Sequence, residues 1–313
     1  MSNGFDQPSL PNFLLACKRR LPRTPHLSRI MHRVGASAQG SVASHLVHQL
    51  CVQTAEDGIT VLVMELQQIV DRYAEAIEYV DQNIDLVGVN KRTGVMYQPG
   101  FKSLNEEPAV DAIDDGWEIL HQGERQIHVM GINYPGLPAY AKIDHLITTD
   151  GIEAEPEWGI EVKRLQSVGD NGKGNDYATA KVLSPYLKDR GMLHDALRLR
   201  EYGFSRRVAV IGYSFDYDRA SMLEALHRHK SEEAKSVLNE ISKVLKKNGG
   251  SLHTRPLIEF ADAIMGLRGL TSGPRAQRDF EAWRHPAGGR GVVFGWEIRR
   301  PQLEKNYDPR HPW

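Results

Sequence analysis

The segment Trp158-Gly-Ile-Glu-Val-Lys-Arg164 constrains the fold most, because its residue types and spacing predict a short β-strand. Successive side chains of a strand point to opposite faces. Glu161 and Lys163 therefore share one face. Ile160 and Val162 share the other face. The strand thus presents a carboxylate and an ammonium group together, either as part of a reactive site or as an ordinary salt bridge on a surface strand.

A second predicted strand, Tyr140-Ala-Lys-Ile-Asp-His-Leu-Ile147, lies upstream and is followed by the turn residues Asp150-Gly151. Apolar residues flank its acid, Asp144. If the two strands pair as neighbours, Asp144 meets Glu161 and Lys163 at one point. Magnesium takes one or two carboxylates besides a phosphate and keeps several waters. The lysine can hold a water or neutralise charge on the phosphate. Asp144, Glu161 and Lys163 together therefore suit metal-assisted hydrolysis of a phosphodiester.

The spacing of these residues resembles a known signature: Asp144 is followed by sixteen residues and then by Glu161-Val-Lys163. The resemblance is to the Asp…(Asp/Glu)-x-Lys signature of the PD-(D/E)xK nuclease superfamily, to which most type II restriction endonucleases belong. The resemblance covers residues 140–217, and Ile143 stands where the superfamily's name has proline, a position that the family often varies. It implies a restriction-endonuclease-like α/β fold, in which a mixed central sheet is flanked by helices. It also implies that Asp144 and Glu161 bind Mg2+ and that Lys163 manages the nucleophilic water.

The elements after Lys163 follow the order of this family. Residues 176–202 are predicted to be largely helical, and Gly203 ends the helix. Residues 206–213 contain a continuous apolar run after two arginines, which is typical of a strand buried on both faces of a parallel sheet. A strand, a helix and a strand in this order predict a right-handed crossover, so we expect the last strand to be parallel to its partner.

Two helices are predicted before these strands, one over residues 41–54 and a longer one over residues 59–80. Glu65 lies at the edge of the apolar stripe of the longer helix. Many members of the superfamily add a glutamate to the metal site from a helix in this place. The resemblance therefore makes Glu65 the candidate for a further catalytic residue, and the alternative is an exposed helical glutamate.

Hairpins are predicted between residues 90 and 140. One turns at Lys91-Arg-Thr-Gly94, and a second joins strands at 116–120 and 125–130. Downstream, the sequence predicts three helices and a last strand, over residues 218–229, 231–247, 255–267 and 291–300. These helices are expected to cover the sheet or to build a dimer surface.

Basic residues are concentrated at the N-terminus, where residues 1–50 contain six arginines and lysines against the single acid Asp6. Such an arm neutralises DNA phosphates without reading sequence. The alternative for this arm is a solvated tail. For Lys173 the alternative is a flexible loop at 169–175, and for Lys181 and Lys188 it is a solvated helical face. The candidate DNA contacts are Arg19, Arg20, Lys173, Lys181, Lys188 and Arg290.

The length of 313 residues allows one large or two modest domains, and we expect a single elaborated α/β nuclease domain. Within it, residues 1–40 form the basic arm, 41–217 the catalytic core, and 218–313 a helical and C-terminal strand extension. Cys17 and Cys51 provide neither a disulfide framework nor a metal-ligand spacing. With no apolar run of membrane-spanning length and no signal-peptide pattern, the sequence predicts a cytoplasmic protein without a membrane partner.

The function expected from this set is that of a Mg2+-dependent endonuclease on double-stranded DNA, similar to a type II restriction enzyme. One site per chain and a two-stranded target imply a homodimer. Two alternatives remain open: another nuclease of the superfamily, acting in repair, junction resolution or phage defence, and a non-catalytic DNA-binding protein with this fold. A metabolic enzyme has little support, since the sequence contains no dinucleotide fingerprint and no nucleophile elbow.

Overall fold

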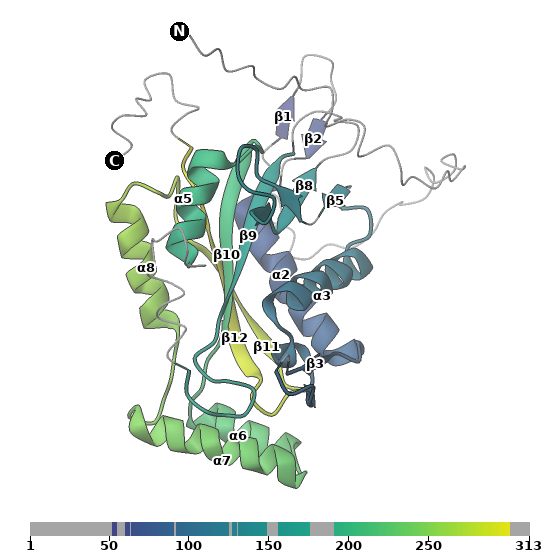
Figure 1. Cartoon of the computed structure of the whole chain (residues 1–313), viewed down its shortest axis with the longest axis vertical. Coiled ribbons are helices and arrows are strands. Elements are labelled where there is room, and N and C mark those ends of the chain that lie inside the picture. The colour runs from purple at the N-terminus through teal and green to yellow at the C-terminus, as the bar shows by residue number, and fades with distance from the viewer. Residues whose placement is uncertain are drawn as a thin grey trace, which may run out of the picture. The chain divides into compact units, whose positions relative to one another are not determined.

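The computed structural model describes residues 52–54, 60–62, 64–90, 92–124, 127–129, 131–148, 156–175 and 191–300, and their architecture is α/β with a six-stranded main sheet (Figure 1). Within this sheet β9 and β10 run parallel, and the other neighbouring pairs are antiparallel. The prediction of an α/β chain with a mixed sheet flanked by helices is confirmed at this level. The strand order is β11 (Ala276–Ala282), β12 (Gly289–Glu297), β10 (Arg207–Phe215), β9 (Trp158–Leu165), β8 (His145–Thr148) and β5 (Ile127–Val129).

The two parallel strands are joined through α5 (Met192–Tyr202), which follows β9 and precedes β10, so the predicted parallel pairing is confirmed. The register sets Glu161 opposite Val210 and Lys163 opposite Gly212. Every residue of β9 is buried. Strands in such a position are normally apolar throughout, because burying a charge is costly unless it is paired. The three ionisable residues here, Glu161, Lys163 and Arg164, therefore require partners.

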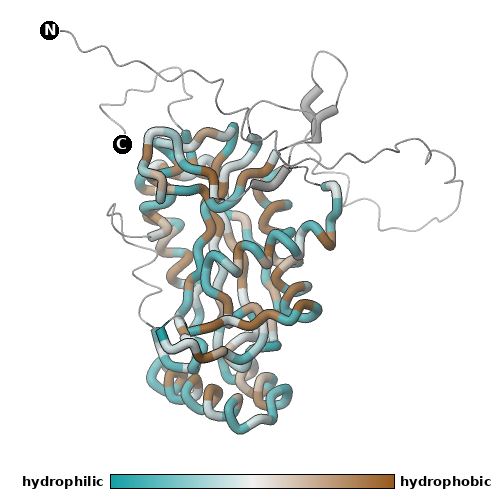
Figure 2. Tube along the Cα trace, turned by 45° about the vertical axis from the view of Figure 1, so that its right-hand side comes forward, coloured by the Kyte–Doolittle hydropathy of each residue, from teal (hydrophilic) through white to brown (hydrophobic). Residues whose placement is uncertain are grey.

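Helices cover both faces of the sheet, α2 (Leu66–Asn83) and α3 (Glu106–Leu120) on one side, α5 and α8 (Arg255–Leu267) on the other (Figure 1). The central strand β10 carries apolar residues on both faces. Ala209 and Ile211 belong to the hydrophobic core under α2 and α3. Val208 and Val210 belong to the core under α5 and α8. Figure 2 shows the matching pattern on the helices, where brown hydrophobic residues recur between hydrophilic ones.

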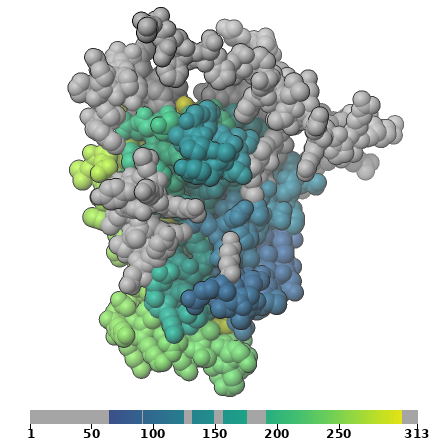
Figure 3. Space-filling view, in the orientation of Figure 1, coloured from purple at the N-terminus to yellow at the C-terminus, as the bar shows by residue number. Residues whose placement is uncertain are grey.

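The remaining elements are short hairpins and two helices beyond the carboxyl end of β10. The helices α6 and α7 form the green surface at the lower end of Figure 3, and each begins at a side-chain cap: Asp218 accepts from the Ser221 amide and Ser231 from the Ala234 amide. These elements are α6 (Arg219–Arg228), α7 (Glu232–Lys247), the 3-10 turn η2 (Phe101–Ser103), and the pairs β1 (Val52–Thr54) with β2 (Thr60–Leu62), β3 (Val87–Val89) with β4 (Met96–Pro99), and β6 (Ile132–Asn133) with β7 (Lys142–Ile143).

The two helices predicted upstream are wrong at the ends that face each other. Val52–Thr54, expected to end the first helix, form β1, and Thr60–Leu62, expected inside the second, form β2. β-Branched residues at these positions favour strands, and pairing of the two segments outweighs the helical periodicity. The second helix, α2, consequently begins at Leu66, and Glu65 becomes its N-cap.

The strand predicted at residues 116–120 is also wrong, because these residues are the last turns of α3. A longer window shows a helical repeat in which Ala109, Ile113 and Trp117 recur every fourth residue and are buried. Asn105 is the N-cap, and acids in the first turn suit the helix dipole. The predicted strand 140–147 is divided at Asp144, which lies at a bend between β7 and β8.

The helices predicted after residue 217 are confirmed. The helices expected at 218–229, 231–247 and 255–267 are α6, α7 and α8, and the described residues of the turn predicted at 91–94, residues 92–94, lie between β3 and β4. The last predicted strand is β12, whereas its neighbour β11 was not predicted. No helix within the described ranges has the length and apolar character needed to cross a membrane.

The crossing of α2 and α3 gives a test of this packing. A Cβ atom at Gly116 would lie 2.7 Å from Val80 Cγ1 and 3.1 Å from the backbone oxygen of Ala76. We expect Gly116→Ala to lower the free energy of unfolding by about 1–3 kcal/mol, despite alanine's better helix propensity. The matched control is Gly266→Ala in α8, where a Cβ meets nothing within 4 Å. It should stabilise by up to about 1 kcal/mol in urea denaturation. Equal effects of the two substitutions would contradict the packing argument.

Candidate active site

The pairing of β8 with β9 places Asp144 beside Glu161. His145 pairs with Ile160, so Asp144 and Glu161 are the next residues outward in the same register. Asp144 Oδ2 accepts a hydrogen bond of 2.7 Å from the backbone N–H of Val162. The bend at Asp144 thus holds its carboxylate against the middle of β9. This geometry brings together the two acids that the sequence singled out.

Lys163 lies on the same face of β9, and its ammonium group is held by acids from two helices. Its Nζ atom lies 3.0 Å from Asp195 Oδ2 on α5 and 3.0 Å from Glu106 Oε1 at the start of α3. Lys163 and Asp195 are both buried. The ammonium group is therefore fixed in position rather than free to sample solvent.

The neighbour of Lys163 in the sheet explains how α5 comes so close. Gly212 of β10 pairs with Lys163, and a Cβ atom there would lie 2.8 Å from the terminal carbon of Met192 and nearer still to the ring of Phe294. The missing side chain leaves room for the first turn of α5, which carries Asp195.

The start of α3 reaches Lys163 along the open side of β9. The pairing with β8 covers only Trp158 to Ile160, and among the described residues no strand is paired with the end of β9 on that side. The Arg164 side chain there donates a hydrogen bond to the carbonyl oxygen of Leu104. Glu106 lies two residues further along the chain and meets Lys163. The edge left by β8 is thus occupied by a helix start that supplies a carboxylate.

Two further residues contact Glu161. Arg198 of α5 places one guanidinium nitrogen 2.7 Å from Glu161 Oε1 and 2.9 Å from Asp195 Oδ1. The Tyr134 hydroxyl donates a hydrogen bond to the same Glu161 oxygen, and the Arg198 guanidinium lies 5.1 Å from the centre of the Tyr134 ring. We call this group the acidic cluster; its charged members are Glu106, Asp144, Glu161, Lys163, Asp195 and Arg198.

The acidic cluster contains more negative than positive charge, since four carboxylates face one lysine and one arginine. Burial raises the pKa of Asp144 to about 6 against the attraction of Lys163. Burial, together with Asp144 and Asp195, also raises the pKa of Glu161 well above its usual range. Burial alone would lower the pKa of Lys163, but Asp195 and Glu106 outweigh it and raise that pKa. The lysine is thus charged at neutral pH, while the acids are short of positive charge.

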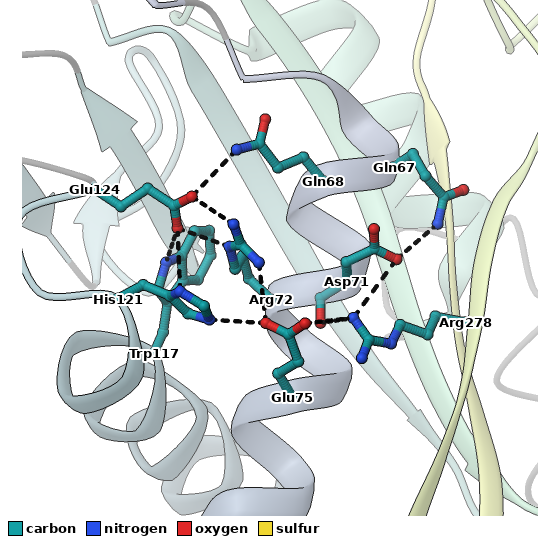
Figure 4. A network of polar contacts seen from close by, with 9 residues as sticks. All are labelled: Gln67, Gln68, Asp71, Arg72, Glu75, Trp117, His121, Glu124 and Arg278. Atoms are coloured by element: carbon teal, nitrogen blue, oxygen red, sulfur yellow. Dashed lines mark hydrogen bonds and ion pairs between the residues drawn. The ribbon is translucent and has the colours of Figure 1, made fainter. Parts of the chain in front are cut away.

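A second polar network behaves differently. It joins α2, the end of α3 and β11, and Figure 4 shows Glu75 between Arg72, His121 and Arg278. Although burial opposes it, the hydrogen bonds from Arg278 and His121 lower the pKa of Glu75. Arg72 likewise lowers the pKa of Glu124. Carboxylates with lowered pKa values are satisfied by their cations, so this network is a structural tie, whereas the acidic cluster retains unbalanced negative charge.

The other residues predicted for the site lie elsewhere. Glu65 forms ion pairs with Arg207, which also binds Glu297, and no described contact joins it to the acidic cluster. Lys173 is exposed in a loop whose Gly172 packs against the backbone of α7. Arg290 lies at the far end of β12 and pairs with Glu281 at 3.6 Å. Arg19, Arg20, Lys181 and Lys188 lie outside the described residues.

Four members of the site were not predicted: Glu106, Tyr134, Asp195 and Arg198. Asp195 carries a recognisable signal, because it falls on the buried stripe of α5 with Met192, Ala196 and Leu199. An acid on such a stripe needs a buried partner. Glu106 and Tyr134 carry no comparable signal, since their roles depend on contacts between distant segments.

Comparisons of the chain with protein-family models, with curated proteins and with solved structures gave no match. Over the described ranges, no group of three or more His, Cys, Asp or Glu side chains is arranged so that it could hold a metal ion by itself. Any ion at the acidic cluster would therefore depend on Asp144 and Glu161 together with water or substrate oxygens.

Replacing Asp144 by asparagine tests the unbalanced charge. The folded pKa of about 6 exceeds the usual 3.8, so the folded protein binds the proton more tightly and loses stability as pH rises between these values. The asparagine amide keeps an acceptor for the Val162 N–H but carries no charge. We expect Asp144→Asn to be more stable than wild type by up to about 3 kcal/mol at about pH 8, and the gain to shrink at about pH 4. Denaturant unfolding at both pH values measures this, and a less stable variant at about pH 8 would contradict it.

Replacing Lys163 should have the opposite effect. Lys163→Met leaves Asp195 and Glu106 without their shared cation, and we expect a loss of about 3–5 kcal/mol at neutral pH. The control is Lys243→Met, because Lys243 forms an exposed ion pair with Glu240 on α7. Its effect should stay within about 0.5 kcal/mol. Equilibrium unfolding of both variants provides the comparison, and a Lys163→Met protein as stable as wild type would show that the ion pairs are dispensable.

Proposed function

We propose that this protein is a Mg2+-dependent endonuclease that hydrolyses phosphodiester bonds of double-stranded DNA, with a restriction-endonuclease-like fold and a PD-(D/E)xK site. The observation that carries the proposal is the meeting of Asp144, Glu161 and Lys163 at one point of the sheet. Asp144 lies at the bend just before β8, and Glu161 lies on the neighbouring strand β9. The helix α5 and the parallel strand β10 follow in the order that the superfamily requires.

The donor set fits a hard divalent cation. Asp144 and Glu161 supply carboxylate oxygens. Burial is the main cause of their raised pKa values, and the neighbouring acids add to it. Asp144 and Glu161 would hold the ion, which when bound polarises a phosphoryl oxygen and acidifies a water. Magnesium does not require a closed set of protein ligands, because water and the substrate's phosphate oxygens complete its coordination.

Lys163 would act on the water and the phosphate. Its ammonium group is held by Asp195 and Glu106, so it presents donors at a fixed place beside the two acids. A charged lysine there holds the attacking water by a hydrogen bond and offsets the charge that grows on the phosphate oxygens. Asp195 and Glu106 are positioning residues in this scheme, since they act through Lys163.

We further propose that the enzyme is similar to type II restriction enzymes and cuts both strands of its target. One site per chain cuts one strand, so cleavage of both strands at one position requires two copies, and a homodimer matches a two-fold symmetric target. The wider superfamily includes nucleases of repair, junction resolution and phage defence with looser sequence preference. Discrete or heterogeneous products separate these forms of the same proposal.

A non-catalytic DNA-binding protein is the second candidate, and one observation favours it. Glu161 is already engaged by Arg198 and Tyr134, and Lys163 by Asp195 and Glu106, as expected if the acids serve only to tie helices to the sheet. This candidate predicts that DNA, if bound at all, stays intact in the presence of magnesium.

The test is incubation of supercoiled and linear genomic DNA, methylated and unmethylated, with wild-type protein, in magnesium and in chelator. We expect cleavage that requires magnesium, and discrete bands if the enzyme recognises a sequence. Glu161→Gln and Lys163→Ala should each reduce cleavage by at least about a hundredfold, the size of an effect expected for a group that acts on the transition state. End sequencing of the products would identify the cleaved positions.

Because Lys163→Ala is expected to lose stability, the variant that decides the question is Glu161→Gln, whose uncharged amide suits the buried position. Unfolding curves should show that it is at least as stable as wild type. The exposed Lys243→Met protein serves as the active control. Magnesium-dependent cleavage that survives Glu161→Gln would place the chemistry elsewhere, and intact DNA with folded wild type under every condition would favour the binding protein.

A further inference from the structure

Glu161 is occupied in this structure by a residue of the protein itself. One oxygen, Oε1, receives both the Arg198 guanidinium at 2.7 Å and the hydroxyl of Tyr134. This is the same carboxylate that would hold a divalent cation in the proposed function. A cation and a guanidinium at one carboxylate compete, because each is drawn by the same negative charge and repels the other.

Arg198 is the most accessible partner of Glu161. Its side chain is 18% exposed, against 2% for Glu161 and 1% for Asp195. The arginine therefore lies on the solvent side of the two acids.

A second attachment keeps Arg198 in place when it leaves Glu161. Its guanidinium lies 2.9 Å from Asp195 Oδ1, three residues earlier on α5, and packs over the Tyr134 ring. Asp195 in turn holds Lys163 through its other oxygen. Release from Glu161 alone leaves the guanidinium charged, anchored and beside the site, where its planar donors suit a phosphate oxygen.

We propose that Arg198 is a displaceable counter-ion of the acidic cluster, which holds Glu161 in the absence of a divalent cation and gives up that carboxylate when the cation binds. The inference rests on the proposed function, since it takes Glu161 as a metal ligand. It adds regulation of that site, because Arg198 lowers the affinity of Glu161 for the metal ion until a phosphodiester binds the guanidinium. Ion and substrate therefore bind cooperatively.

The experiment measures binding of manganese(II) alone, from the loss of the free-ion electron paramagnetic resonance signal, without DNA. Arg198→Met removes the competing charge, and we expect its dissociation constant to be at least about tenfold lower than that of wild type. Arg198→Gln, which is neutral but keeps amide donors for Glu161 and Asp195, should bind the ion equally tightly. It tests the inference even if the methionine variant does not fold.

A matched control is available in Arg207. It is also held by two carboxylates, Glu65 and Glu297, and lies over an aromatic ring, that of Trp158, at 4.1 Å, but it is not part of the acidic cluster. Arg207→Met should leave manganese binding unchanged. In a Glu161→Gln background, Arg198→Met should no longer tighten binding, because the competition has been removed.

The outcomes separate the inference from the proposed function. Binding that depends on Glu161 in wild type and becomes tighter in both Arg198 variants supports the displaceable counter-ion. Binding that depends on Glu161 but is unchanged or weaker in both Arg198 variants overturns the inference and leaves the metal site standing. Absence of Glu161-dependent binding in wild type and in both variants overturns the metal site, and the inference with it.

Discussion

The contact on which the site depends is the pair of ion pairs from Lys163 to Asp195 and Glu106. These ion pairs join the middle of the sheet to α5 on one face and to the start of α3, which belongs to the other layer. A buried lysine needs such partners, because an unpaired ammonium group in a strand covered on both faces would lose its hydration without compensation. The arrangement of strand and helices is therefore tied to one charge, and any change at that charge acts on three elements together.

The electrostatics distinguish this site from ordinary buried ion pairs in the same molecule. Around Glu75 the cations outweigh burial and lower the pKa, which means that the charged form is favoured by the fold. Around Asp144 and Glu161 burial and neighbouring acids raise the pKa, so the fold disfavours the charge that it places there. A chain selected for stability alone would be improved by neutral side chains at these positions. The proposed metal site would require carboxylates of this kind at these positions.

The sequence was informative where a signal is local. Strand alternation around Glu161 and the apolar run of β10 each predicted an element that the structure contains. Prediction failed where a longer range decided the outcome. Gly116 to Leu120 has strand-like residues but completes a helix because of packing against α2, and residues 60–62 pair with β1 instead of extending α2. The partners of Lys163 and Glu161 come from segments far apart in the chain, and apart from Asp195 on the buried stripe of α5, no local pattern predicts them.

Asp195 connects the two cations of the site. Its Oδ2 atom lies against Lys163 and its Oδ1 atom against Arg198, so the positions of ammonium and guanidinium are linked through one carboxylate. If Arg198 releases Glu161, Asp195 still balances part of its charge and keeps Lys163 in place. The residue proposed to manage the water and the residue proposed to give way to the ion therefore share an anchor that need not move. That division lets one helix, α5, hold the lysine rigidly while presenting an arginine that responds to what enters the site.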